Sequence, residues 1–483
     1  MVTKSDLVKI NQYLYEIPTS FRADMRVPAR VYANEELVEM AIEDRALDQL
    51  INTTTLPGIV GHALAMPDVH QGYGFSIGGV AATKLPGGVI SPGGVGYDIN
   101  CGVRLLGSNM MREELQPHLD ELMTALYREV PSGVGEGGNI KLSAHDMDAI
   151  LERGAAWAVQ KGYGSQEDLE RTEAQGSMPG ADPSKVSTRA RERARTQTGT
   201  LGSGNHFLEI DEIVEIYDEK VASAFGLYPG RIAVQIHSGS RALGHQVCTD
   251  YVRSLQQALP KYGIRLPDRE LVCAPFDSPE GQAYFKAMVC AANYAWANRQ
   301  VMAHLTRKVF DRVLAGKVRR RELYMVYDVA HNIAKIEEHT VNGARIKVCV
   351  HRKGATRSFG PGAPELPAVY REVGQPVLIP GSMGTASYVL VGTQKAMDET
   401  FGSTCHGAGR VMSRHAAKRD VRGSELRQEL EAQGIVVRAG SMSGLAEEAP
   451  SAYKDVDRVI EVVHGAGLSR KVARLVPIGV IKG

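Results

Sequence analysis

Two glycine-rich segments between residues 66 and 104 carry the first signs of chemistry. They read Met-Pro-Asp-Val-His-Gln-Gly-Tyr-Gly from Met66 and Gly-Gly-Val-Gly-Tyr-Asp-Ile-Asn-Cys-Gly-Val-Arg from Gly93. The second places a carboxylate, Asp98, and a thiol, Cys101, in one turn where both can point at a single metal ion. Taken alone, the segment fits a buried structural cysteine as well, because free cysteine is among the most buried residue types.

Three histidines stand at or beside the ends of predicted strands: His206, His237 and His331. A rigid sheet can present side chains from its strand ends to a shared cleft. Each histidine alone is more typical of a structural position. Together with Asp98 and Cys101, they supply enough ligands for two transition-metal ions that share the thiolate. Two such ions could hold the nucleophile and the leaving oxygen of a phosphoryl transfer.

A third segment, Ser-Thr-Cys-His-Gly-Ala-Gly-Arg at 403–410, places His406 among small residues. An imidazole nitrogen is a competent nucleophile towards phosphorus and forms a phosphoramidate that can be passed on. Arg410 and the glycine N–H groups would stabilise the phosphate charge. An ordinary loop histidine is the alternative, and Cys405 is a competing nucleophile.

Basic residues near these segments suggest phosphate contacts. Residues 351–357, His-Arg-Lys-Gly-Ala-Thr-Arg, resemble a phosphate grip beside a strand, and Arg241 follows His237 closely enough to reach the same cleft. The runs 319–321 and 414–427 are more typical of solvated helix faces. Neither a Walker A sequence nor the Lys-x-Asp-Gly motif of lysyl nucleotidyl-transferring ligases occurs.

The elements that must position these residues mix strands and helices without regular βαβ alternation, which favours an α+β fold. Predicted helices are 35–50, 112–129 and 279–315. Predicted strands are 206–210, 231–237, 322–328, 344–350, 376–380 and 387–391. The polar segment 164–200 is predicted to be a basic surface excursion or flexible loop. No linker divides the chain, so 1–483 is expected to be one domain.

Composition excludes several classes of protein. Of 483 residues, 43% are hydrophobic, which rules out general disorder. The 56 Lys and Arg balance 55 Asp and Glu, so the whole molecule offers no electrostatic case for binding nucleic acid. Glycine and proline interrupt the uncharged stretch 373–394, which indicates strands and loops and not a membrane span. Six scattered cysteines and an N-terminus without an apolar core favour a reduced, cytoplasmic setting.

From about residue 57 to the terminal Pro-Ile-Gly-Val-Ile-Lys-Gly, the chain resembles the RtcB RNA-splicing ligases. The strings that carry this resemblance occur in order: MPDVHQGYG, GGVGYDINCGVR, LGSGNHFLE, HSGSR, NYAWANRQ, YDVAHN, HRKGATR, IPGSMGTASYVL and CHGAGR. The resemblance implies the family's own mixed α+β fold around a central cleft. It also implies an enzyme that uses GTP and Mn²⁺ to join RNA 2′,3′-cyclic phosphate or 3′-phosphate ends to 5′-hydroxyl ends.

The resemblance assigns roles to the metal-like residues. Cys101 would bridge two Mn²⁺ ions, with His237 and His331 completing one site. Asp98 and His206 would complete the other.

The resemblance also implies a nucleotide site. His406 would attack the α-phosphorus of GTP and become guanylylated, after which GMP would pass to the RNA 3′-phosphate and be displaced by the 5′-hydroxyl. The residues implied for the nucleotide are Asn205 at the phosphate, Glu209, Ser387 and Lys482 at the guanine edges, Tyr453 stacked on the base, and Ser382, Met383, Gly407, Ala408, Gly409 and Arg410 at the sugar and phosphate. Asp68 would orient a ligand or assist catalysis, and Arg241 would act beside the metals.

Two other hypotheses remain open at this level. A dinuclear metal phosphohydrolase could use the same ligands, but it has no need of His406 or a nucleotide pocket. An RNA-binding or chaperone-type module with a structural metal would not depend on GTP. The expected partners are GTP and RNA ends, such as tRNA halves, with an archease-type activator. Neither the physiological RNA nor the oligomeric state follows from the sequence.

Overall fold

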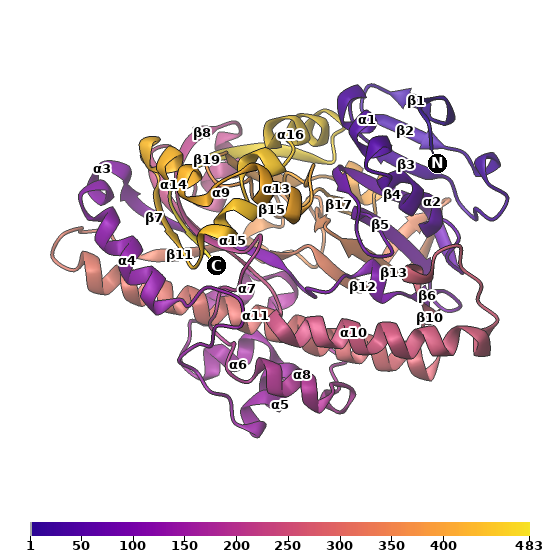
Figure 1. Cartoon of the computed structure of the whole chain (residues 1–483), viewed down its shortest axis with the longest axis horizontal. Helices are drawn as coiled ribbons and strands as arrows, with labels where there is room; N and C mark the ends of the chain where they lie inside the picture. The colour runs from indigo at the N-terminus through magenta and orange to yellow at the C-terminus, as the bar shows by residue number, and fades with distance from the viewer. Residues whose placement is uncertain (1) are drawn as a thin grey trace.

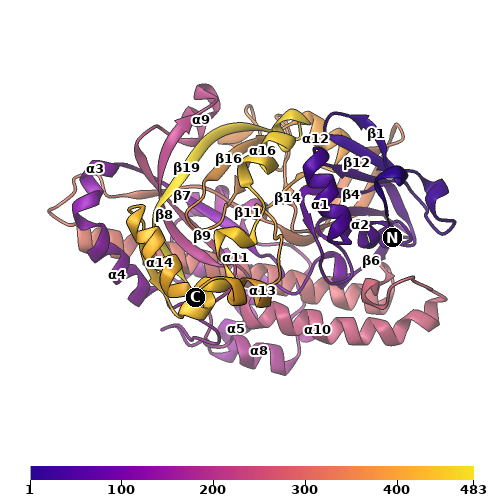
Figure 2. The ribbon, with the colours of Figure 1, turned by 45° about the horizontal axis from the view of Figure 1, so that its top comes forward.

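The computed structural model describes residues 2–483. Within them the strands form a seven-stranded sheet, an eight-stranded sheet and two short two-stranded ladders. The two large sheets lie side by side, with the N-terminal strands (indigo) at one end and the long helices α10 and α11 beneath both (Figures 1 and 2). This mixed arrangement confirms the predicted α+β class.

The seven-stranded sheet is antiparallel except where β3 runs parallel to β4. Its strands, in spatial order, are β1 Val8–Asn11, β2 Leu14–Ile17, β3 Ala29–Tyr32, β4 Ile59–His70, β5 Ile77–Lys84, β13 Ala344–Lys353 and β12 Asn332–Val341.

The eight-stranded sheet is antiparallel except for its short strand β18, which pairs in parallel with β19. Its main path is β11 Leu323–Ala330, β7 Gly102–Met111, β9 Arg231–Ser238, β8 Phe207–Ile216, β19 Ser469–Lys482, β16 Ser387–Gly392 and β15 Pro376–Ile379, with β18 at Val436–Ala439. The short ladders pair β6 Val89–Ile90 with β10 Ala274–Pro275, and β14 Thr356–Arg357 with β17 Ser403–Thr404.

Helices cover these sheets and fill the space around them. They are α1 Glu35–Glu43, α2 Ala46–Thr53, α3 Arg112–Leu115, α4 Leu119–Glu129, α5 Ala144–Arg153, α6 Ala155–Gln160, α7 Gln166–Glu170, α8 Thr188–Ala194, α9 Glu219–Phe225, α10 Arg241–Ala258, α11 Pro279–Leu314, α12 Gln394–Glu399, α13 Arg414–Asp420, α14 Gly423–Ala432, α15 Met442–Glu447 and α16 Val456–Gly465.

Both faces of the eight-stranded sheet are buried. Alternate residues of β7 point to opposite faces: Leu106 packs in one cluster with Phe310 of α11, and Leu105 packs in another with Phe225 of α9. Helices on both sides therefore hold this sheet rigid, which suits strand ends that must present functional groups.

Helix α11 is the central rod of the molecule, as its predicted range anticipates. Ser278 caps its N-terminus by accepting a hydrogen bond from the N–H of Gly281, and Pro279 occupies the first turn, where a missing N–H costs nothing. Residues 287–303 are buried on every face. An all-round apolar helix belongs in a core or a membrane, but among residues 2–483 no helix has the length and apolar character that crossing a bilayer requires.

The six predicted strands are confirmed, and the uncharged stretch 373–394 contributes β15 and β16. Two predicted helices are interrupted. The range 35–50 divides into α1 and α2 at Arg45, which has φ of 62°. The range 112–129 divides into α3 and α4 around Pro117, because proline cannot continue the hydrogen-bond ladder.

The prediction of a flexible loop at 164–200 is wrong. This segment contains α7 and α8, and the side chains of Asp168 and Glu173 within it are buried. Asp168 accepts two hydrogen bonds, each 2.7 Å long, from the guanidinium of Arg307 on α11. Its polar residues therefore serve as internal partners, which a hydrophobicity pattern cannot reveal.

A buried ion network joins α11 to the eight-stranded sheet. Asp328 on β11 accepts hydrogen bonds from Arg104 on β7 at 2.8 Å, and from Arg299 on α11 at 2.9 and 2.8 Å. All three side chains are fully buried. Arg299 also donates to the backbone carbonyls of Asn100 at 2.7 Å and Ser238 at 2.8 Å. One guanidinium thus fixes the start of β7 and the end of β9.

We expect Asp328→Ala to lower the free energy of unfolding by about 3–5 kcal/mol, because it leaves two buried guanidinium groups without their carboxylate. Equilibrium urea denaturation measures the change. The matched control is Glu338→Ala, which removes the exposed partner of Arg345 and should cost less than about 0.5 kcal/mol. Equal losses in both variants would contradict the structural role of the network.

Candidate active site

All four cysteine and histidine side chains predicted as metal ligands stand at one end of the eight-stranded sheet. The positions are the start of β7 (Cys101), the end of β11 (His331), the end of β9 (His237) and the start of β8 (His206). The register explains their convergence, since Gly102 lies opposite both Ala330 and Ser238, and Phe207 lies opposite His237. Antiparallel pairing thus brings residues that are far apart in the chain to one edge of the sheet. Cys101 and His331, for example, are 230 positions apart.

Glycine is required at two points here by close approach. A Cβ on Gly102 would lie 2.1 Å from the carbonyl oxygen of Val329, and a Cβ on Gly239 would lie 2.3 Å from both carboxylate oxygens of Asp98. The glycines that surround Cys101 and follow His237 in the sequence therefore let the ligand-bearing turns close on one another.

The five predicted metal ligands form two groups that share Cys101: Cys101 with His237 and His331, and Cys101 with Asp98 and His206. The Cys101 Sγ lies 3.3 Å from His237 Nε2 and 3.4 Å from His206 Nε2. His237 Nε2 lies 3.3 Å from His331 Nε2. Metal–nitrogen bonds of about 2.0–2.1 Å place tetrahedral ligand atoms about 3.4 Å apart, so these separations fit metal ions.

The protonation states of the site residues also suit bound cations. Burial lowers the pKa values of His237 and His331 well below the usual range and keeps both rings neutral, as ligation requires. Burial, followed by the nearby Asp98 carboxylate, raises the pKa of the Cys101 thiol. A thiolate at this position therefore needs a compensating cation.

The contacts of the His206 ring indicate a metal ion more specifically. Its Nδ1 faces the carbonyl oxygen of Leu201 at 3.0 Å, and its Nε2 faces Asp98 Oδ2 at 2.8 Å. A neutral imidazole has a single N–H and cannot donate to both acceptors. If Nδ1 donates to Leu201, a proton or a metal ion must lie on the Nε2 side, and a backbone carbonyl on the other nitrogen is the usual partner of a metal-bound histidine.

Arg241 stands behind this pair. Its Nη1 lies 3.3 Å from His206 Nδ1, and its Nε donates to Thr200 Oγ1 at 3.4 Å. Its φ is 56°, in the left-handed region that an arginine rarely adopts. Such local strain is found at functional sites. The guanidinium therefore lies beside the Asp98–His206 group, although it does not line the cleft.

His406 belongs to a different structural unit from the metal ligands. It follows β17, and its ring centroid lies 5.0 Å from that of His331. Its Nδ1 lies 2.5 Å from Asp68 Oδ2, and the same oxygen accepts hydrogen bonds from the backbone N–H groups of His406 and Gly407 at 2.9 and 3.2 Å. Asp68 on β4 thus fixes the ring orientation and leaves Nε2 without a hydrogen-bond partner among the described residues.

Asp68 is fully buried, and burial alone would raise its pKa. The contacts with His406 and the charge of Lys454 outweigh burial and hold the pKa of this carboxyl below its usual value. Lys454 itself donates to the carbonyl oxygens of Pro67 and Val69 on either side of Asp68. Burial lowers its pKa to about 8. No sequence motif singles out this lysine.

A cleft of about 350 Å³ joins the metal ligands to His406. Most of the predicted nucleotide-binding residues line it, and they are Asn205, Ser382, Met383, His406, Gly407, Ala408, Gly409, Arg410, Tyr453 and Lys482. Two predicted residues do not line it. Ser387 accepts a hydrogen bond from the N–H of Gly381 at 3.0 Å, and Glu209 is buried on β8, opposite Val480.

The charged side chains at the far end of the cleft influence one another's pKa values. Lys482 lies opposite Phe207, and its Nζ donates to the carbonyl oxygen of Gly204 at 3.1 Å. Burial lowers the pKa of Lys482, while Glu448 and Glu209 act against that shift. Burial, followed by the Asp211 carboxylate, raises the pKa of Glu209 well above its usual range. A ligand with donor groups would therefore favour the ionised Glu209.

Arg410 and Tyr453 also form part of this wall. Arg410 lies over the Tyr453 ring at 5.0 Å and donates to its hydroxyl at 3.1 Å, while that hydroxyl contacts Glu448. Arg410 thus occupies one face of the ring that is predicted to stack on guanine.

The prediction that residues 351–357 bind phosphate is wrong for most of these residues. The buried Arg352 donates to both oxygens of Glu337 and to Ser403, and the buried Arg357 donates to Gln375. Only Lys353 and Gly354 line the cleft. Strand alternation turns neighbouring residues of β13 to opposite faces, so a cluster of cations in sequence is not a cluster in space. Cys405 is fully buried with a raised thiol pKa, which makes it a poor competitor to His406.

The string NYAWANRQ, which marks the resemblance, has a supporting role. Asn298 on α11 accepts hydrogen bonds from the N–H groups of Gly199 and Thr200 and donates to the carbonyl of Gly239. Asn332, just after His331, likewise donates to the Asp98 carbonyl at 3.1 Å and accepts from Gly354 N–H at 2.8 Å. Sequence motifs alone did not distinguish these positioning residues from ligands.

Comparison with known proteins agrees with the fold and the site. A model of the family described as tRNA-splicing ligase RtcB matches residues 49–483. The tRNA-splicing ligases RtcB of Archaeoglobus fulgidus and Thermococcus kodakarensis are 56% and 55% identical to the chain over 477 residues, each alignment covering 99% of both chains. The RNA-splicing ligase RtcB of Mycobacterium tuberculosis is 55% identical over 438 residues, which are 90% of this chain and all of its own.

The chain therefore belongs to the RtcB family, as the sequence motifs indicate. It is an enzyme of the RNA-ligase class, a splicing ligase for RNA.

We expect Cys101→Ala to lose bound metal at both positions, because its sulfur belongs to both ligand groups. His331→Ala should lose about one ion of two, since it belongs to one group. Elemental analysis after Mn²⁺ loading and gel filtration counts the ions. Cys248→Ala, at a buried cysteine outside the groups, is the control. Two ions retained in Cys101→Ala would exclude the shared thiolate.

Proposed function

We propose that this RNA ligase joins RNA 2′,3′-cyclic phosphate or 3′-phosphate ends to 5′-hydroxyl ends, using GTP, two Mn²⁺ ions and a guanylylated His406. The observation that carries the proposal is the Asp68–His406 pair beside the two ligand groups. The His406 imidazole is oriented by Asp68, and its ring lies 5.0 Å from that of a metal ligand. Neither the phosphohydrolase hypothesis nor the binding-module hypothesis requires such an imidazole.

Cys101, His237 and His331 would hold one ion, and Cys101, Asp98 and His206 the other. Two ions in these positions would neutralise phosphate charge and lower the pKa of an attacking hydroxyl. Manganese is the family's metal, while Cys, His and Asp ligands by their chemistry also accept other divalent ions.

In the first step, His406 acts as the nucleophile. Asp68 accepts a hydrogen bond from Nδ1–H, so the lone pair lies on Nε2. A new bond forms between Nε2 and the α-phosphorus of GTP, and the bond from that phosphorus to the bridging oxygen breaks, releasing pyrophosphate. Asp68 stabilises the positive charge that develops on the ring.

Guanine would lie at the Lys482 end of the cleft. Its O6 acceptor suits the Lys482 ammonium and the Ser387 hydroxyl, and its N1 and N2 donors suit the Glu209 carboxylate. Since Ser387 and Glu209 do not line the cleft in this conformation, they would meet the base only after a local rearrangement. Tyr453 would stack on the base. Residues Ser382, Met383, Gly407, Ala408, Gly409 and Arg410 would surround the sugar and phosphate, and Asn205 would contact the phosphate near the metals.

In the later steps, water first opens a 2′,3′-cyclic phosphate, where one is present, by breaking its P–O2′ bond to leave a 3′-phosphate and a 2′-hydroxyl. An RNA 3′-phosphate oxygen then attacks the phosphorus of His406–GMP and releases the imidazole, giving an RNA end capped as 3′-pp-5′-G. The 5′-hydroxyl of the second RNA then attacks the RNA phosphorus and releases GMP. Arg241 adds positive charge beside Asp98 and His206 for these phosphates. RNA ends such as tRNA halves are the proposed substrates, with an archease-type activator and a cytoplasmic location where GTP and RNA ends occur together.

Incubation with α-³²P-labelled GTP and Mn²⁺ tests the covalent step. We expect acid-labile label on His406, found by peptide mapping after denaturing electrophoresis, because a nitrogen–phosphorus bond survives base and not acid. His406→Ala should lose all label. His415→Ala, which removes an exposed histidine of α13, should retain it. Metal-loaded protein that takes no label would refute the proposal and favour the phosphohydrolase.

Asp68→Asn should slow single-turnover guanylylation by at least about a hundredfold, because the ring loses the carboxylate that orients and stabilises it. The apparent KM for GTP should change little, since Asp68 does not line the cleft. Asp311→Asn, at a carboxylate with 72% side-chain exposure, is the control. A raised KM with an unchanged rate would show instead that Asp68 binds the nucleotide.

A further inference from the structure

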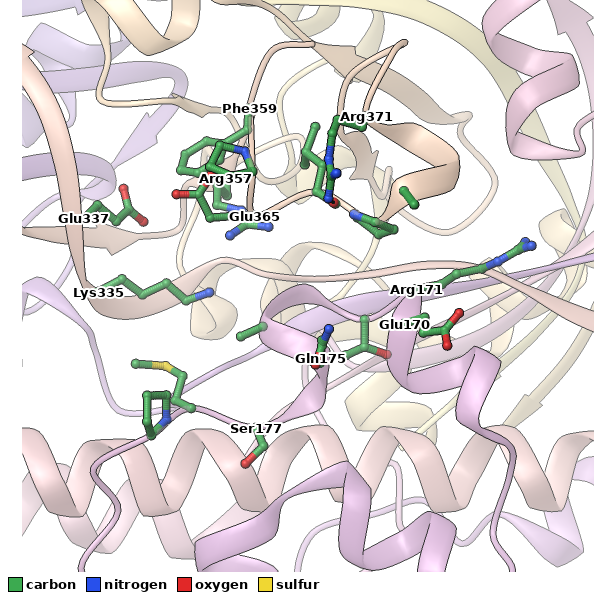
Figure 3. A pocket seen from close by; sticks show the side chains of 18 of the residues that line it. Glu170, Arg171, Gln175, Ser177, Lys335, Glu337, Arg357, Phe359, Glu365 and Arg371 are labelled. Carbon is green, nitrogen blue, oxygen red and sulfur yellow. The ribbon is translucent and has the colours of Figure 1, made fainter. Parts of the chain in front are cut away.

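A second, larger cavity lies apart from the catalytic cleft. Its volume is about 1040 Å³, and none of its lining residues lines the cleft. Three segments form it: 167–179, residues 335–337 of β12 with Arg357 and Phe359, and 364–371. Figure 3 shows side chains from these segments around the cavity, among them Lys335, Arg357 and Arg371. Ligand-binding pockets have volumes of about 300–1,000 Å³.

The two buried cations that line the cavity, Lys335 and Arg357, share one buried carboxylate, Glu173, which lies behind the wall. Glu173 Oε1 lies 2.5 Å from Lys335 Nζ and 3.9 Å from Arg357 Nε, and Glu337 pairs with Arg352 at 2.6 Å. Burial alone would raise the pKa of Glu173, but Lys335 and Arg357 hold it at about 2. Glu337 is engaged by Arg352, so Glu173 is the one carboxylate that Lys335 and Arg357 share. The two cations therefore have donors left over for a further acceptor.

Arg357 presents an unused hydrogen-bond donor to the cavity. Its Nε donates to Gln375 at 2.9 Å and its Nη2 to the hydroxyl of Tyr327 at 3.3 Å. Among residues 2–483, no side chain or carbonyl accepts a hydrogen bond from its Nη1. The residue as a whole is only 4% exposed, but its Nη1 is not among the unpaired polar atoms that are cut off from solvent, so this donor faces the cavity. Lys335 also has a single carboxylate acceptor, Glu173, for its three N–H groups.

The rest of the wall is mostly apolar. Arg357 lies 4.6 Å over the ring of Phe359, and Phe285 and Leu366 line the cavity as buried side chains. At the mouth, Ile336 is 43% and Val369 56% exposed. Glu170 and Glu365 are also exposed at the cavity, where solvent screens their charge.

The backbone at the edge of the cavity is strained. Ala174 and Gln175, which both line the cavity, have φ values of 54° and 52°. Two consecutive non-glycine residues in the left-handed region are uncommon, and such conformations persist where surrounding structure and function require them.

From these features we infer that the cavity is a second binding site, for a small organic anion. Its carboxylate or phosphate group would pair with Arg357 and Lys335, and its flat apolar body would pack against Phe359, Phe285 and Leu366. The anion would accept hydrogen bonds from the unused donors of Arg357 and Lys335, while the body would cover the apolar wall.

The site is connected to the catalytic cleft through two strands. Arg357 on β14 pairs with Ser403 on β17, and His406 follows that strand. Lys335 lies on β12, which begins directly after His331. A ligand bound here would therefore contact β12, which follows His331, and β14, which pairs with the strand before His406.

Isothermal titration with naphthalene-1-carboxylate tests the site, with 1-naphthalenemethanol as the neutral analogue of the same shape. We expect one molecule of the carboxylate to bind per chain, and the alcohol to bind at least about tenfold more weakly because it offers no charge to Arg357. Equal binding of the two probes, or no saturable heat with the carboxylate up to about 10 mM, would overturn the inference.

Two variants locate the binding. Arg357→Met removes the charge, and Ala368→Trp blocks the cavity from an exposed lining position without altering charge. Each should weaken carboxylate binding at least about tenfold. Arg320→Met, at an exposed arginine outside the cavity, should not. If Arg357→Met fails to fold, as circular dichroism would reveal, Ala368→Trp decides. Unchanged binding in Ala368→Trp would overturn the inference.

The proposed function is tested independently on the same samples. Ala368→Trp should still take label from GTP on His406, since Ala368 is outside the cleft. His406→Ala should still bind the carboxylate. Loss of carboxylate binding in His406→Ala would place the probe in the catalytic cleft and refute the second site.

Discussion

The structure depends on one buried interaction, the pairing of Arg299 with Asp328. From the centre of α11, Arg299 reaches the carboxylate on β11 and the backbone carbonyls that precede β7 and end β9. Two buried charges are costly unless paired and hydrogen-bonded, and this arrangement satisfies both conditions. In doing so it fixes the strand ends that carry Cys101, His237 and His331, so the core and the site share one support.

The site also requires both large sheets. The eight-stranded sheet carries the candidate metal ligands at its strand ends, while Asp68 comes from β4 of the seven-stranded sheet and orients His406 after the short strand β17. Neither sheet alone brings a nucleophile to the metals. The relative position of the two sheets therefore sets the distance between His406 and His331, and α11 beneath both sheets helps to hold it (Figure 1).

Much of the site could be predicted from the sequence because its ligands are short, chemically distinctive side chains placed at strand ends. Cys101 and the three histidines needed only the strand pattern and their residue types. Lys454 and Asn298 could not be found in this way, because they act through backbone carbonyls and N–H groups that only the folded chain brings near. Arg352 was misread for a related reason: its partner Glu337 lies across the β12–β13 pair. The segment 164–200 was misread because its buried Asp168 and Glu173 are internal partners of Arg307 and Lys335.

The partners of each buried charged group distinguish groups that support the fold from groups that could bind a ligand. Arg104, Arg299 and Arg352 each have carboxylate partners at hydrogen-bond distance and are closed to any ligand. The metal ligands differ, since Cys101 and His206 have partners that demand an added cation. Arg357 has an unused donor, which suits an added anion. Missing partners alone do not define a site, since the buried Tyr284 hydroxyl and the Trp296 indole N–H lack partners as well. Cys101 and Arg357 differ because each lines a cleft or cavity that a ligand can enter.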